Sequence, residues 1–129
     1  MIGIVIVAHG GLAREYLAAV EHVVGKQPDI RVVSIEADHD REAKKIEIRA
    51  AADAVDAGDG VVVVTDMFGG SPSNLAMPAC QESDRKVLYG ANLPMLVKLV
   101  KSRSKPLDQA LDCALQAGRK YIDCCDGGV

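Results

Sequence analysis

Runs of consecutive apolar residues alternate along this chain with segments whose apolar positions recur at helical spacing. Four runs, most of them rich in β-branched residues, predict strands over residues 2–8, 30–35, 61–66 and 86–89. Such nearly continuous apolar strands are typical of parallel sheets, which helices cover on both faces. The pattern therefore predicts strands that are buried on both faces rather than strands with one face in water.

The segments between and after the strands predict five helices. The first has one apolar face, formed by Leu12, Tyr16, Ala19, Val20 and Val23, and Gly25 ends it. Asp40 is the expected N-cap of a second helix that reaches residue 57. The others are expected to begin near Pro72, Leu93 and Leu107. This alternation predicts an α/β fold in three layers, with a mainly parallel sheet between helices and a single domain over residues 1–129.

Composition narrows the class of protein. A chain of 129 residues can bury a core, and that core must be aliphatic because the chain has one Phe, three Tyr and no Trp. The formal net charge of −3 argues against a nucleic-acid partner. No run approaches the roughly 18 apolar residues of a membrane span, and the apolar N-terminus lacks the basic start and cleavage site of a signal peptide. We expect a cytoplasmic protein.

The possible metal ligands show no binding pattern. The four cysteines, at positions 80, 113, 124 and 125, have no C-x-x-C spacing and are expected to be free thiols, with Cys80 and Cys113 buried on helices. The sequence Asp38-His39-Asp40 offers no fourth ligand, and a loop with a helix cap is the better interpretation. We therefore expect no metal.

His9 is the main candidate for chemistry. It follows the first predicted strand directly and precedes two glycines, so it lies at the carboxyl end of the sheet, where α/β proteins bind ligands. Asp66 ends the third predicted strand and lies within reach of His9 if these two strands are neighbours. A carboxylate on one ring nitrogen would fix the tautomer and leave the other nitrogen as a nucleophile.

The turn Gly69-Gly70-Ser71 supplies features that complement this pair. Its glycines let backbone N–H groups approach a ligand, and the helix that follows directs its positive end toward an anion. Ser71 could donate a further hydrogen bond, although Ser71, Asn74 and Asn92 are also residue types that simply favour helix starts and loops. Together the groups suit a phosphoryl group carried on His9.

Four motifs, in order, resemble the enzyme IIA domains of the mannose family in the bacterial phosphoenolpyruvate:sugar phosphotransferase system (PTS). They are Ile4-Val5-Ile6-Val7-Ala8-His9-Gly10, Asp66-Met67-Phe68-Gly69-Gly70-Ser71-Pro72-Ser73-Asn74, Gly90-Ala91-Asn92-Leu93-Pro94-Met95-Leu96 and Ala117-Gly118-Arg119. The resemblance covers nearly the whole chain. One departure is Ser73, which stands where sugar-transporting relatives often carry an aromatic residue.

The resemblance implies a phosphoryl relay. His9 would receive the group on Nε2 from the histidine-containing phosphocarrier protein and pass it to a IIB component, with Asp66 orienting the ring through Nδ1. Gly10, Gly70 and Ser71 would bind the phosphate, and no cofactor would be needed because the group arrives already activated. The family fold implies strand order 2-1-3-4. It also implies a homodimer with an antiparallel edge strand exchanged from the C-terminal part, and contact with the membrane only through a permease complex.

Two other functions stay open at this point. The chain could be a stand-alone regulatory module, in which the phosphorylation state of His9 controls a partner protein and no sugar is transported. A hydrolase with Ser71, His9 and Asp66 as a triad is less favoured. The sequence lacks the G-x-S-x-G elbow of such enzymes, because Ser73 replaces the second glycine.

Overall fold

The computed structural model describes residues 1–81 and 84–128 and has the α/β fold that the sequence predicts. Four parallel strands form one sheet in the order β2-β1-β3-β4. The elements in chain order are β1 (Gly3–His9), α1 (Leu12–Val24), β2 (Ile30–Ile35), α2 (Arg41–Val55), β3 (Val61–Thr65), α3 (Ser71–Ala76), the 3₁₀ helix η1 (Met77–Cys80), β4 (Arg85–Leu88), α4 (Leu93–Lys101) and α5 (Leu107–Lys120). The strand order that the family resemblance implies is thus confirmed.

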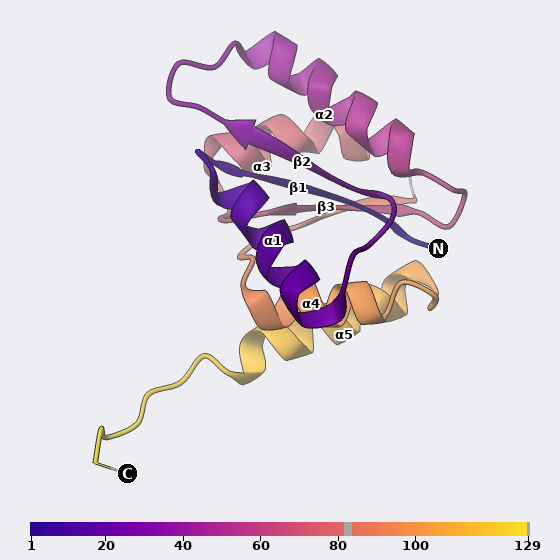
Figure 1. Ribbon diagram of the computed structural model, residues 1–129. Coiled ribbons are helices and arrows are strands. Elements are labelled where there is room, and N and C mark those ends of the chain that lie inside the picture. The colour runs from indigo at the N-terminus through magenta and orange to yellow at the C-terminus, as the bar shows by residue number, and fades with distance from the viewer. Residues whose placement is uncertain (82–83, 129) are drawn as a thin grey trace.

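Helices cover both faces of the sheet. Helices α2 and α3 lie on one face, and α1, α4 and α5 lie on the other (Figure 1). Alternate residues of the central strands point to opposite faces, so that Ile4 and Ile6 pack toward α1, whereas Val5 and Val7 pack toward α2. Both halves of the core are aliphatic, as the composition predicts.

The strand register brings two loops together at the carboxyl edge of the sheet. Val7 of β1 pairs with Thr65 of β3, and His9 pairs with Ile35 of β2. The residue that follows Thr65 therefore emerges beside the last residues of β1. This register places Asp66 next to His9.

Some element boundaries differ from the prediction. Strand β3 ends at Thr65, so Asp66 is the first residue of the loop, and β4 covers Arg85–Leu88 rather than residues 86–89. Helix α2 ends at Val55, two residues earlier than predicted. Helix α3 has only six residues and continues as η1, because Pro78 lacks the N–H that an α-helical hydrogen bond requires.

The expectation that Cys80 and Cys113 are buried was wrong, since both are only partly buried. Cys113 lies on α5 beside the stripe of small residues that faces the core, which includes Ala110 and Ala114. Cys80 ends the short η1 turn, which is close to the surface. None of the four cysteines forms a disulfide within the described part of the chain.

The segment after α5 has no regular structure and extends away from the rest of the molecule (Figure 1). None of its residues up to 128 pairs with the outer edge of β4 in the single chain, and Val129 lies outside the described residues. The exchanged edge strand therefore stays a prediction. Within the described ranges, no helix has both the length and the apolar character needed to cross a membrane.

Candidate functional site

His9 and Asp66 form a pair held by two hydrogen bonds to one carboxylate oxygen. The backbone N–H of His9 donates to Oδ2 of Asp66 at 3.0 Å, and ring Nδ1 lies 2.8 Å from the same oxygen. The side chain of His9 is 49% exposed, whereas that of Asp66 is only 10% exposed. The predicted proximity is confirmed, and the carboxylate lies beneath an accessible ring.

The charge of Asp66 determines the tautomer of the histidine. Burial favours the neutral acid, but the backbone and ring hydrogen bonds from His9, with the attraction of the ring in its protonated form, outweigh burial, so the pKa of Asp66 lies below its ordinary 3.8. Asp66 is therefore an anion at neutral pH and can only accept hydrogen bonds. Nδ1 must be the donor, which leaves Nε2 of the neutral ring with a lone pair.

The Gly69-Gly70-Ser71 turn approaches the ring on the side of Nε2. Gly69 has a φ of +84°, a conformation that favours glycine. Gly70 has an ordinary φ of −83°, but a Cβ there would lie 3.2 Å from Cε1 and 3.6 Å from Nε2 of His9. Glycine at position 70 thus keeps the space beside Nε2 open, and α3 begins at the next residue, Ser71.

Ser73 closes this turn, a role that the sequence analysis did not assign. Its buried hydroxyl accepts a hydrogen bond from the N–H of Gly69 at 3.0 Å and donates to the carbonyl of Gly70 at 3.1 Å. Serine bonded to backbone three or four residues earlier is a common turn device, so a serine shortly after Gly-Gly is the signal that could have revealed it. Ser73 therefore faces the turn and not a partner protein.

Gly10 does not offer the free amide that was expected of a phosphate ligand. Its N–H donates to the carbonyl of Ile35 at 3.0 Å and so extends the pairing of β1 with β2. Its φ of +54° turns the chain toward α1. Gly10 consequently shapes the loop that carries His9, and its backbone donor is already in use.

The proposed hydrolase triad lacks its central contact. Among the residues that the structure describes, the His9 ring is hydrogen-bonded to Asp66 and not to Ser71. Ser71 is half-buried at the first position of α3, beside Gly70. The contacts therefore make Nε2 of His9, and not the Ser71 hydroxyl, the candidate nucleophile.

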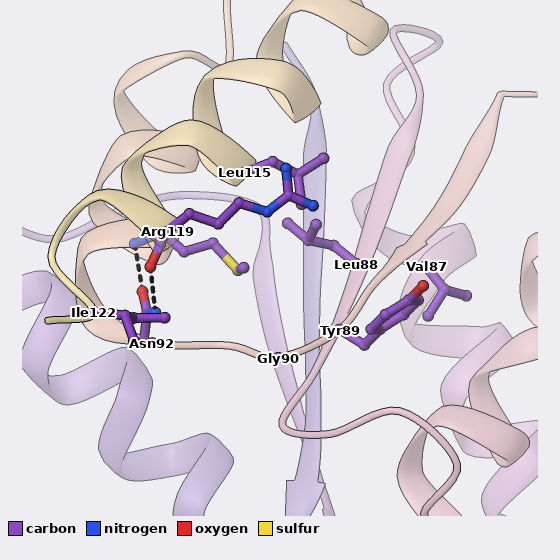
Figure 2. Close-up of a pocket in the computed structure, with 10 residues that line it drawn as sticks. Val87, Leu88, Tyr89, Gly90, Asn92, Leu115, Arg119 and Ile122 are labelled. Atoms are coloured by element: carbon purple, nitrogen blue, oxygen red, sulfur yellow. Dashed lines mark hydrogen bonds between the residues drawn. The ribbon is translucent and has the colours of Figure 1, made fainter.

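Asn92 and Asp40 are helix caps, whereas Asn74 is an exposed residue within α3. Oδ1 of Asn92 accepts from the N–H of Met95 at 3.0 Å, and its Nδ2 donates to the carbonyl of Gly118 at 2.9 Å (Figure 2). Asp40 accepts from the N–H of Ala43 at 3.1 Å, which supports the cap interpretation of that loop. These residues build the frame around the site rather than the site itself.

Exposed apolar side chains lie on the loops next to the His9–Asp66 pair. Met67 and Phe68 follow Asp66 directly, and the ring of Phe68 packs against Tyr89, which follows β4, with centroids 4.7 Å apart. Phe68 is 62% exposed and Tyr89 is 48% exposed. An exposed apolar cluster of this kind is typical of a surface that binds another protein.

The chain is similar to PTS proteins in sequence and in structure. It matches the family model of the PTS system fructose IIA component, EIIA-man, over residues 3–113. It is 29% identical over 124 residues to the PTS system mannose-specific EIIAB component of Escherichia coli strain K12, an alignment that covers 94% of this chain and 38% of that protein. The chain thus spans well under half the length of the curated relatives it matches.

Two solved structures have the same fold over almost their full length. PTS component EIIA from Streptococcus agalactiae superposes with a TM-score of 0.85 at 27% identity, covering 96% of this chain and 97% of that one. The mannose/sorbose-specific IIA subunit from Enterococcus faecalis gives the same score and identity, with 96% and 94% covered. With the family match over residues 3–113, these likenesses show that the chain belongs to the EIIA-man family of the phosphotransferase system.

Proposed function

We propose that this protein is a phosphoryl carrier of the phosphoenolpyruvate-dependent phosphotransferase system. His9 accepts a phosphoryl group from the histidine-containing phosphocarrier protein and passes it to a IIB component, in the service of sugar uptake. The observation that carries this proposal is the pairing of His9 with Asp66, whose carboxylate holds Nδ1 at 2.8 Å on a half-exposed ring. Membership of the EIIA-man family supports it.

The transfer step needs little beyond positioning and charge. The lone pair of Nε2 attacks the phosphorus, a new P–N bond forms, and the P–N bond to the donor histidine breaks, so that the donor ring leaves with its electron pair. Nδ1 keeps its proton, and the ring of His9 becomes a cation, which the Asp66 carboxylate stabilises. The N–H groups of Gly70 and Ser71 and the Ser71 hydroxyl are the groups that would bind the phosphoryl oxygens. No metal or cofactor enters the step.

The surface around His9 suits transfer between two proteins. The exposed ring allows the donor histidine to approach in line, and the apolar cluster of Met67, Phe68 and Tyr89 provides area for a transient complex. Because both partners are proteins of the cytoplasm in this system, we place the chain there, and any contact with a membrane would run through a permease complex.

Phosphorylation of the protein tests the proposal directly. We expect incubation with phosphoenolpyruvate, enzyme I and the phosphocarrier to add one acid-labile phosphate, seen in the intact mass, and His9→Ala to remove it. The matched control is His22→Ala, because His22 is exposed on α1. Absence of phosphate on the folded wild-type protein would refute the relay. Phosphate that no IIB component accepts would instead favour the regulatory function.

We further propose that the protein is a homodimer that exchanges its C-terminal segment. The outer edge of β4 is unpaired within the described chain, and a pocket of about 350 Å³ lies between this edge and the end of α5 (Figure 2). Ile122, in the segment after α5, lines that pocket, yet in the single chain 74% of this apolar residue stays exposed. We expect a dimer by light scattering and a monomer after removal of residues 121–129; a dimer that persists without them would refute the exchange.

A further inference from the structure

Tyr16 connects helix α1 to the segment that carries Asp66. Its hydroxyl donates to the carbonyl of Ala91 at 3.1 Å, in the loop before α4. The N–H of Ala91 in turn donates to the carbonyl of Thr65 at 3.1 Å, and Thr65 directly precedes Asp66. Two consecutive hydrogen bonds thus run from the Tyr16 side chain to the end of β3.

The Asp66 carboxylate depends on its surroundings for its orientation. Only Oδ2 contacts His9, whereas Oδ1 is buried and has no hydrogen-bond partner among the described residues. Tyr16 lies within the electrostatic range of this carboxylate, because burial and the charge of Asp66 both raise the pKa of Tyr16. Its phenol therefore stays protonated and remains a hydrogen-bond donor at neutral pH.

The two members of the pair lie at the ends of two neighbouring strands, with His9 the last residue of β1 and Asp66 the first residue after β3, and Tyr16 links both sides. His9 ends β1, and α1 begins three residues later at Leu12, so α1 and His9 share a short connection. Asp66 follows β3. We propose that Tyr16 is a positioning residue, whose hydroxyl ties α1 to the Ala91 loop and so fixes the separation of His9 and Asp66. This inference rests on the proposed transfer function.

Tyr16→Phe tests the inference because it keeps the ring and removes only the hydroxyl. We expect the rate of His9 phosphorylation at saturating phosphocarrier to fall about fivefold, the equivalent of one modest hydrogen bond. The KM for the phosphocarrier should not change, because Tyr16 is not part of the apolar cluster that would meet the donor. The control is Val23→Ala, which shortens an exposed side chain of the same helix and should transfer at the wild-type rate.

A spectroscopic measurement on the unphosphorylated protein separates positioning from a general loss of structure. We expect Tyr16→Phe to shift or broaden the ring ¹⁵N and Nδ1–H signals of His9, while Val23→Ala leaves them unchanged. A wild-type rate, or a slower rate with unaltered ring signals, would overturn the inference. If the wild-type protein accepts no phosphate, the proposed function fails, and the ring signals still decide whether Tyr16 positions the pair.

Discussion

Neighbouring glycines at positions 69 and 70 have different physical reasons to be glycine. Gly69 has a positive φ and open space around it, so its requirement is conformational. Gly70 has a φ that any residue adopts, but its Cα faces the His9 ring, so its requirement is steric. Substitution by alanine should therefore affect different properties of the protein at the two positions.

For Gly70→Ala we expect slower phosphorylation with little loss of stability. The new methyl group would lie 3.2 Å from Cε1 and 3.6 Å from Nε2 of His9, where an incoming phosphoryl group must fit. If this methyl group pushes the His9 ring out of line with the phosphoryl group, transfer should slow by roughly tenfold or more. Gly69→Ala should instead lower the free energy of unfolding by about 1 kcal/mol through backbone strain. Phosphorylation kinetics and urea unfolding of both variants check this, and equal effects on both properties would contradict it.

The acidic pH dependence of stability should carry a contribution from Asp66. Its pKa is below 3.8 in the folded protein and close to 3.8 in the unfolded chain, so the unfolded state takes up a proton first on acidification. This stabilisation is complete above the unfolded pKa and is lost as pH falls through the lower folded pKa. The wild-type protein should therefore lose its stability advantage over Asp66→Asn between about pH 4 and pH 2.

Urea unfolding of both proteins across that range measures this difference. Hydrogen bonds from the Gly58 N–H and from Arg85 lower the pKa of Asp56. Its contribution to the pH dependence of stability is the same in both proteins and cancels in the comparison. A difference in stability that stays constant from pH 6 to pH 2 would show that Asp66 titrates alike in the folded and unfolded states.

At the scale of elements, the sequence predicted the strands and helices well because each has a strong local signal. The valine run of β3 is buried on both faces, and Asp40 and Asn92 cap the helices that follow them. The prediction failed where a neighbour far along the chain determines the outcome. The N–H of Gly10 bonds to Ile35 of another strand, so the role of Gly10 could not be read from local patterns. The bond from Gly69 to Ser73 is local, and the serine that follows Gly-Gly was a signal for it that the prediction did not use.

Gly118 shows how a motif residue can serve packing rather than chemistry. Helix α5 presents Ala110, Ala114 and Gly118 to its neighbours, and these small residues allow α4 to approach closely. A Cβ on Gly118 would lie 3.1 Å from both Cβ and Cε of Met95. The close approach of α4 and α5 at Gly118 also brings Asn92 within reach, and its Nδ2 donates to the Gly118 carbonyl.

We expect Gly118→Ala to lower the free energy of unfolding by about 1–3 kcal/mol, the range for overpacking a tight contact. The control is Gly127→Ala, because no atom lies within 4 Å of a Cβ at that position. Urea unfolding compares the two variants. If Gly118→Ala proved as stable as Gly127→Ala, α4 and α5 would move apart at no cost in free energy. Shortening Met95 in the Gly118→Ala variant would then restore no stability.

At the scale of the whole molecule, two buried arginines join segments that are distant in sequence. Arg85 at the start of β4 is paired with Asp53 and Asp56 at the end of α2, at 2.7 and 3.1 Å. Arg103, in the connection from α4 to α5, is 3% exposed and bonds to carbonyls near the starts of β1 and β2. Charged residues are rarely buried, so composition and periodicity gave no indication of either.

Arg103 should set the stability of the fold without affecting transfer. Its guanidinium donates from Nε to Ile2 at 2.8 Å, and from Nη1 and Nη2 to Pro28 and Asp29 at 2.8 and 3.0 Å. These bonds lie at the amino end of the sheet, opposite the end that carries His9. Burial lowers the pKa of Arg103, and the charge of Asp29 opposes this shift.

For Arg103→Lys we expect a loss of about 1–3 kcal/mol in the free energy of unfolding, because one ammonium cannot reach three carbonyls that are arranged to match the guanidinium fork, and the carbonyl of Ile2 is buried. Arg31→Lys, at an exposed arginine of β2, should change stability little. Below the unfolding transition, His9 of Arg103→Lys should accept phosphate at the wild-type rate. A reduced rate in the folded variant would mean that the two ends of the sheet are coupled, because the hydrogen bonds of Arg103 lie at the amino end of the sheet.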